Sequence, residues 1–179
     1  MSVINNQETV VIPNRLLIPA GFTAEANIWD RIYAVMRQNH TIVGNVGSIS
    51  NINDTYTWEV MIPEFPAQRA LVPINETGLD EVVFNKMVGQ DVYLRIQGCD
   101  PENNLLACSY SEAVEAVKEL VVGRLAVGKR IPAVIKAIVS KPPRLIVDIG
   151  GGVLVEIGSK EARRYYSRYL NEQYQPGQQ

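Results

Sequence analysis

The sequence predicts a mainly β fold with helices, arranged as two successive small barrels of which the second is incomplete. Residues 42–109 contain five short β-type runs, with a polar connection between the third and the fourth. A helical stretch follows, and then the β pattern starts again. The apolar pattern of residues 60–74 also returns at residues 147–157, an offset of about 85 residues that fits one small module and a linker.

These observations divide the chain into four segments. The first has two β-type runs, each ended by a proline, and reads as an arm. The second is a complete module with a leading helix, the third is a linker helix, and the fourth is the incomplete module. The predicted ranges are 1–22 for the arm, 23–110 for the first module, 111–126 for the linker and 127–179 for the second module.

The leading helix is predicted over residues 24–38. Thr23 is a suitable N-cap, and Glu25 lies in the first turn, where the helix dipole favours an anion. Apolar residues then recur at a spacing of three and four, which predicts a face that packs against the module. They are Ile28, Trp29, Ile32, Tyr33, Val35 and Met36.

The five runs of the first module have the layout of an OB-type Greek-key barrel, with the connection between the third and fourth strands. Gly44 and Gly47 lie inside the first run, where glycines mark the bends of a small barrel. The predicted strands are 42–49, 56–62, 69–74, 91–97 and 105–109.

Ser109 and Glu112 have the capping-box spacing and start the linker helix, which runs to about residue 125. The second module then gives strands over 130–140, 144–149 and 153–157, with a glycine turn at 150–152, and a helix over 159–173. Its last two strands are missing, and natural proteins avoid such open edges. Either the chain is a piece of a longer protein, or another strand completes the barrel. The arm, at residues 9–18, is one candidate, in cis or in a homo-oligomer.

Charge is divided unequally along the chain. Residues 1–122 hold 7 Lys/Arg against 15 Asp/Glu, whereas residues 123–179 hold 10 against 4, although the total is only −2. The two halves therefore have different partners, or they differ only in surface composition. The chain has no bilayer-spanning apolar run and does not begin like a signal peptide, so we expect a cytoplasmic protein without a membrane partner.

The sequence gives no sign of catalysis. Two cysteines and one histidine, His40, are too few for a common zinc site, and we expect neither a metal nor another cofactor. The glycines at 150–152 and the Gly158-Ser159-Lys160 stretch lack the order of a phosphate-binding loop. We therefore expect a protein that is not an enzyme.

The ordered series of segments resembles the S1 domain family. Residues 88–113, VGQDVYLRIQGCDPENNLLACSYSEA, are similar to the closing half of an S1 domain, and residues 71–76 are similar to the segment before the family's His-Ser-Glu turn. Trp29 before the barrel and the restart at residues 127–129 are similar to the tandem arrangement in bacterial ribosomal protein S1. The resemblance covers roughly residues 25–179 and implies tandem OB-fold barrels that bind RNA.

In the first module the resemblance implies stacking of bases on Tyr56 and Trp58, which fall in the strand that carries the family's aromatic residues. Ordinary barrel packing is the alternative. Pro73 stands where the family has His, Asn75 where it has Ser, and Asn104 where a basic residue is expected, while the aspartate is kept as Asp100.

The second module has no aromatic residue in the corresponding strand, but it is basic. Candidate RNA contacts are Lys136, Lys141 and Arg144, together with Arg163, Arg164 and Arg168, which alternate with tyrosines in the last helix. Arginines among tyrosines suit stacking on bases and pairing with phosphates. The alternative is a surface helix with half-buried tyrosines.

The resulting hypothesis is a non-catalytic S1-type RNA-binding or ribosome-associated protein in translation or RNA metabolism. Its partners would be single-stranded RNA, the ribosome, or both. The alternative hypothesis is a protein–protein docking module whose acidic OB barrel does not itself bind RNA.

Overall fold

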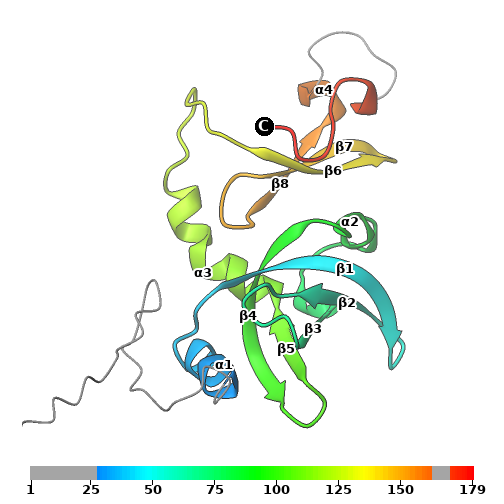
Figure 1. Cartoon of the computed structure of the whole chain (residues 1–179). Coiled ribbons are helices and arrows are strands. Elements are labelled where there is room, and N and C mark those ends of the chain that lie inside the picture. Colours follow the sequence, from blue (N-terminus) through cyan, green and yellow to red (C-terminus); the bar gives the residue numbers. More distant parts are fainter. Residues whose placement is uncertain (1–27, 163–169) are drawn as a thin grey trace, which may run out of the picture.

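The computed structural model describes residues 28–162 and 170–179. These residues form a closed five-stranded barrel and a separate three-stranded sheet, connected by helix α3 (Figure 1). The predicted mainly β fold with helices is therefore confirmed. The strands are β1 (Ile42–Ile52), β2 (Thr55–Met61), β3 (Arg69–Pro73), β4 (Asp91–Asp100), β5 (Leu105–Ser109), β6 (Val134–Ser140), β7 (Pro143–Asp148) and β8 (Leu154–Gly158). The helices are α1 (Ile28–Arg37), η1 (Ile74–Glu76), α2 (Glu81–Lys86), α3 (Tyr110–Val122), α4 (Ser159–Ala162) and η2 (Leu170–Glu172).

The barrel has the strand order β1-β2-β3-β5-β4 and closes through the β1–β4 pair. Only the β3–β5 pair is parallel, because η1 and α2 carry the chain across the barrel between β3 and β4. This order is consistent with an OB-type barrel. Two such barrels in tandem are not formed by the described residues, since those after α3 give only the antiparallel sheet β6-β7-β8.

Tight turns and caps fix the register of the barrel. Asn53 and Asp54 join β1 to β2, and both have a positive φ, at 50° and 59°. This is the backbone of a two-residue turn that suits the right-handed twist of a hairpin and favours Asn and Asp. At the start of α3 the Ser109 hydroxyl accepts a hydrogen bond from the Glu112 amide at 3.2 Å, as the capping spacing predicts.

The barrel has a large apolar core. Seventeen buried residues belong to it, and the largest are Trp58, Phe65 and Phe84, each with no exposed surface. Helix α1 covers part of the barrel with Ile32, which is fully buried. Its neighbours Ile28, Trp29, Val35 and Met36 pack against the same core, so five of the six residues predicted for the packing face are confirmed and Tyr33 is not among them.

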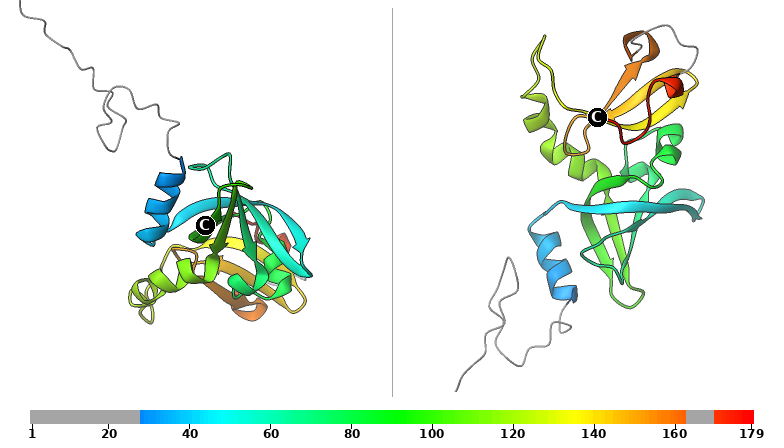
Figure 2. Two further views of the ribbon diagram at one scale, coloured as in Figure 1. Left: turned by 90° about the horizontal axis from the view of Figure 1, so that it is seen from below. Right: turned by 45° about the horizontal axis from the view of Figure 1, so that its top comes forward.

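The three-stranded sheet sits against the barrel, with α2 between them (Figure 2). Val83 of α2 packs with Ala137, Val139 and Ile146 of the sheet in a buried cluster. The glycine turn between β7 and β8 packs on α3: a Cβ at Gly151 would lie 2.7 Å from a methyl carbon of Val117. Because Gly151 also has a φ of +63°, a larger residue at this point would strain the turn and push the two parts of the molecule apart.

Candidate functional site

A groove of about 960 Å³ runs between the barrel and the three-stranded sheet. The barrel contributes the end of α2 and the residues that lead into β4, and the sheet contributes β6 and its turn into β7. We call it the lysine groove, after Lys86, Lys136 and Lys141. The other described residues that line it are Val88, Gln90, Ala137, Ile138, Val139, Ser140, Pro143, Leu170, Asn171 and Pro176. None of the described lining residues is an Asp or a Glu.

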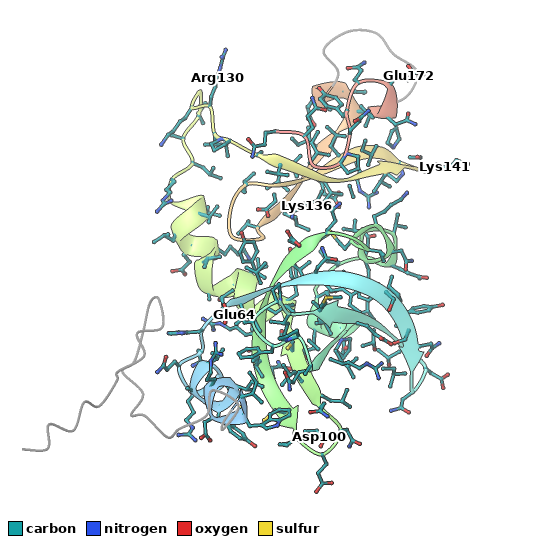
Figure 3. All side chains as sticks on the ribbon, in the orientation of Figure 1. Glu64, Asp100, Arg130, Lys136, Lys141 and Glu172 are labelled. Atoms are coloured by element: carbon teal, nitrogen blue, oxygen red, sulfur yellow. The ribbon has the colours of Figure 1, made fainter. Side chains whose placement is uncertain are left out.

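Each lysine is placed by a different element. Lys86 is the last residue of α2, where a cation is favoured by the partial negative charge of the helix end. Lys136 lies at the bulge of β6, and its Nζ donates a hydrogen bond to the main-chain oxygen of Asp91 at 3.0 Å. Lys141 follows β6 in the turn (Figure 3). The groove therefore exists only because the two parts of the molecule are packed together.

Hydrogen bonds between the barrel and the three-stranded sheet hold the two walls of the groove together. Asp80 caps α2 by accepting from the Val83 amide at 2.9 Å, and its other carboxylate oxygen accepts from Arg144 at 2.8 Å. On the α3 side, the Tyr110 hydroxyl donates to the Gly152 carbonyl at 2.6 Å. Burial, and to a lesser extent the charge of Asp148, raises the pKa of Tyr110 far above its ordinary value, so this phenol stays a neutral donor.

Arg144, predicted as an RNA contact, is instead part of this interface. Its side chain is only 15% exposed and pairs with Asp80 at 2.8 Å and with Glu156 at 3.3 Å. Because the guanidinium of Arg144 already pairs with two carboxylates, it is not free to bind a phosphate. Arg144 is therefore not part of the candidate site.

Trp58, predicted to stack on a base, lies in the barrel core. Its ring is fully buried, stacks on Phe84 with centroids 4.7 Å apart, and meets Tyr110 edge-on at 5.9 Å. Its Nε1 donates to the Phe84 carbonyl at 3.1 Å. Both the faces and the polar edge of this ring are therefore used in packing, which was the alternative interpretation, and no surface remains for a base.

Tyr56 lies near the start of the same strand and is 45% exposed. A hollow of about 360 Å³ is lined by its neighbours in the strand, Thr55 and Thr57, together with Ile52, Asn53, Leu71, Pro73, Asn75 and Ala107. Tyr56 itself does not line this hollow. The face of strands 2 and 3 is where OB barrels bind oligonucleotides, but this hollow has no charged lining residue to meet a phosphate.

The structure thus brings two predicted residues, Lys136 and Lys141, together with one that sequence reasoning missed. Lys86 lies alone in the acidic half of the chain, and nothing near it in the sequence marks it as part of a basic site. Arg163, Arg164 and Arg168 lie outside the described residues.

Metal binding, thiol chemistry and membrane insertion find little support in the part of the chain that the structure describes. It contains no group of three or more His, Cys, Asp or Glu side chains able to hold a metal ion. Burial raises the pKa of the Cys108 thiol to about 12, which keeps it protonated and unreactive. No helix in residues 28–162 or 170–179 is long and apolar enough to cross a bilayer.

No family model matches the chain, and no curated protein matches it. Among solved structures, it is similar to a chain of the a/eIF2alpha-aDim2p-rRNA complex from Pyrococcus horikoshii OT3, with 19% identity and a TM-score of 0.37. The match covers 48% of this chain and 50% of that one, and therefore spans about half the length of each.

Proposed function

We propose that this chain is a non-catalytic protein that binds single-stranded RNA in the lysine groove and acts in translation or RNA metabolism. The observation that carries the proposal is the grouping of three lysines with no carboxylate among the described lining residues. Lysine ammonium groups are the usual neutral-pH partners of backbone phosphates. The net charge of the chain is −2, so this concentration of positive charge is local to the groove.

The floor of the groove suits bases as well as phosphates. Ile138, which is half-buried, lines it from β6, and Val88, which is exposed, lines the opposite wall, whereas the neighbouring Ala137 and Val139 are buried against α2. Unstacked bases of a single strand can lie on such apolar surface while the lysines meet the backbone, whereas the stacked bases of a duplex are closed to it. Backbone contacts of this kind carry no sequence information of their own, so we expect weak sequence preference.

A salt titration of binding to a labelled uridine decamer tests the proposal. The logarithm of the affinity falls by about 0.7 per phosphate contact for each tenfold rise in salt, so three contacts predict a slope of about −2. The triple variant Lys86→Glu, Lys136→Glu, Lys141→Glu should abolish binding.

The matched control is Arg37→Glu, Lys118→Glu, Lys129→Glu, which changes the net charge equally at three exposed positions outside the groove. It should keep most of the binding and the slope. Equal losses in both triple variants, or no binding of the wild type at 50 mM salt, would refute the proposal.

A second candidate function is docking to a basic protein surface, including that of a ribosome. Residues 1–122 carry a net charge of −8, and the exposed residues Glu64 and Glu102 and the half-buried Asp100 belong to the barrel. Asp100 lies at the end of the barrel away from the three-stranded sheet (Figure 3). If the acidic surface docks, reversing these three charges should reduce co-sedimentation with ribosomes and leave RNA binding unchanged.

A further inference from the structure

The three-stranded sheet meets the barrel at two places, with α3 on the left and α2 on the right in Figure 1. On the α3 side, the turn between β7 and β8 packs on the helix: the Tyr110 hydroxyl donates to the Gly152 carbonyl, and Gly151 lies against Val117. On the α2 side, Val83 packs in a buried cluster with residues of β6 and β7. The covalent connection from α3 to β6 belongs to the first side.

The α3 side has the features of a hinge. Residues 123–133, which connect α3 to β6, form no helix or strand, and residues 122–130 are all exposed. Packing therefore constrains few of their backbone angles, and such a segment can absorb a change of angle between the two parts that it joins. The buried hydrogen bond between Tyr110 and Gly152 keeps the sheet anchored to α3 at this point.

The α2 side is closed by an ion pair between the two parts. One carboxylate oxygen of Asp80 accepts from the Val83 amide at 2.9 Å and caps α2, and the other accepts from Arg144 of β7 at 2.8 Å. The Arg144 guanidinium also lies 3.3 Å from Glu156 of β8. Glu156 belongs to the same sheet as Arg144 and holds the guanidinium in place, whereas Asp80 is the partner that belongs to the barrel.

Helix α2 carries the effect of this pair to the lysine groove. The helix has six residues, so it is about 9 Å long. Asp80 caps its first turn, Val83 packs on the sheet, and Lys86 is its last residue, in one wall of the groove. Because so short a helix moves as one piece, loss of the Asp80 contact displaces Lys86 relative to Lys136 and Lys141 on the other wall.

We propose that Asp80 and Arg144 are positioning residues that latch the barrel to the sheet, and that RNA in the lysine groove holds the same closed form. A strand that contacts Lys86 on one wall and Lys136 and Lys141 on the other binds the closed form more tightly than a form in which the walls have separated. Binding and closure then favour each other by the same factor, because coupling between two equilibria is reciprocal. The role of RNA rests on the proposed function, whereas the latch does not.

Two neighbouring residues of β7 can report separately on the junction and on the sheet. Ile146 is buried in the cluster with Val83 of α2, whereas Val147 is buried in the cluster on the other face of the sheet. Neither is among the described lining residues of the groove. In a chain with Cys99→Ser, the variants Ile146→Cys and Val147→Cys each place one thiol at these positions. A maleimide reaches the first thiol when the barrel and the sheet separate, and the second only when the sheet itself opens.

The latch is tested in the chain without RNA. Asp80→Asn should speed labelling of the Ile146→Cys thiol about tenfold, because a hydrogen bond between charged groups contributes enough to change an equilibrium by that factor. Asparagine still caps α2, so this change removes the charge and keeps the cap. The matched control, Glu81→Gln, removes an exposed carboxylate at the next position and should leave labelling unchanged. Labelling of the Val147→Cys thiol should not change in either variant.

Arg144→Gln tests the same pair from the side of the sheet. It should also speed labelling of the Ile146→Cys thiol, and adding Asp80→Asn should speed it little further, because the pair is already lost. If Ile146→Cys does not fold, Ala137→Cys takes its place in these measurements, since Ala137 is buried in the same cluster.

The uridine decamer tests the coupling to RNA. At about 100 times its dissociation constant, a ligand of the closed form alone lowers the opened population about a hundredfold, so labelling of the Ile146→Cys thiol should slow at least about tenfold. Equal acceleration of both thiols by Asp80→Asn, or none, would overturn the latch. Decamer that binds without slowing the labelling would overturn the coupling alone. Absence of decamer binding would refute the proposed function and the coupling with it, while the measurements without RNA still decide the latch.

Discussion

The barrel and the three-stranded sheet are built on the same strand plan but differ in completeness and in charge. The barrel is closed, has seventeen buried core residues and belongs to the acidic part of the chain. The sheet is open, has a core cluster of five and belongs to the basic part. The difference teaches that a complete barrel and a positive charge do not occur in the same region of this molecule. Among the described residues, three lysines come together at the junction, where one lysine of the barrel meets two of the sheet.

The largest expected effect is on stability, and it distinguishes a buried aromatic residue of the barrel from an exposed one. Trp58→Ala removes a fully buried ring and should lower the free energy of unfolding by about 3–5 kcal/mol. Tyr56→Ala, two residues away on the same strand and 45% exposed, should cost about 1 kcal/mol or less. Urea denaturation measures both values, and similar losses for the two variants would show that Tyr56 is also part of the core.

A smaller effect is expected where the two regions meet. Tyr110→Phe keeps the ring but leaves the Gly152 carbonyl without its donor, which should cost about 1–3 kcal/mol. The loss should fall on the sheet, because the barrel keeps its packing. Hydrogen exchange should therefore become faster in β7 and β8 and stay unchanged in β2. Uniformly faster exchange would mean that the molecule unfolds as one unit.

If RNA contacts both walls of the lysine groove, the lysines of the two walls should contribute equally to the binding affinity. Lys86→Ala from the barrel and Lys141→Ala from the sheet should each remove about one phosphate contact. Each variant should bind the uridine decamer about fourfold more weakly at 0.15 M salt, with a salt slope shallower by about 0.7. If one variant has no effect, RNA contacts only the other wall.

The smallest effect is an alkaline loss of stability confined to the barrel. The pKa of Cys108 is raised by burial to about 12 from an ordinary 9.0, so the folded state holds its proton more tightly than the unfolded chain. Stability is therefore complete below pH 9 and falls as the pH rises toward 12. Cys108→Val should flatten this decline in pH-dependent denaturation, and Cys99→Val should not. An unchanged decline in the Cys108 variant would assign it to other groups, of which buried Tyr110 is the first.

Much of the fold was predictable from local patterns. The β runs and the Ser109 cap are set by neighbouring residues and lie close to where the sequence predicts them, although β1 continues to Ile52 and β6 begins only at Val134. The strand period shows that Trp58 and Val60 share a face of β2, but it does not show that this face is the interior. That depends on closure of the barrel by β4 and β5, which are distant in sequence.

The candidate site was less predictable, for the same reason. Lys136 and Lys141 belong to a basic stretch, whereas Lys86 joins them only because Val83 of α2 packs on the sheet. Arg144 looks like a free cation in the sequence, but Asp80, sixty-four residues earlier, pairs with it in the fold. Long-range packing therefore decides which cations remain open to a ligand.

The most direct test of the central claim is lysine footprinting by limited acetylation, read by mass spectrometry, with and without the uridine decamer. RNA held at the junction should protect Lys86, Lys136 and Lys141 and leave Lys118 and Lys129 unprotected. Protection of Lys118 and Lys129 without the three groove lysines, or no protection at saturating RNA, would contradict the account.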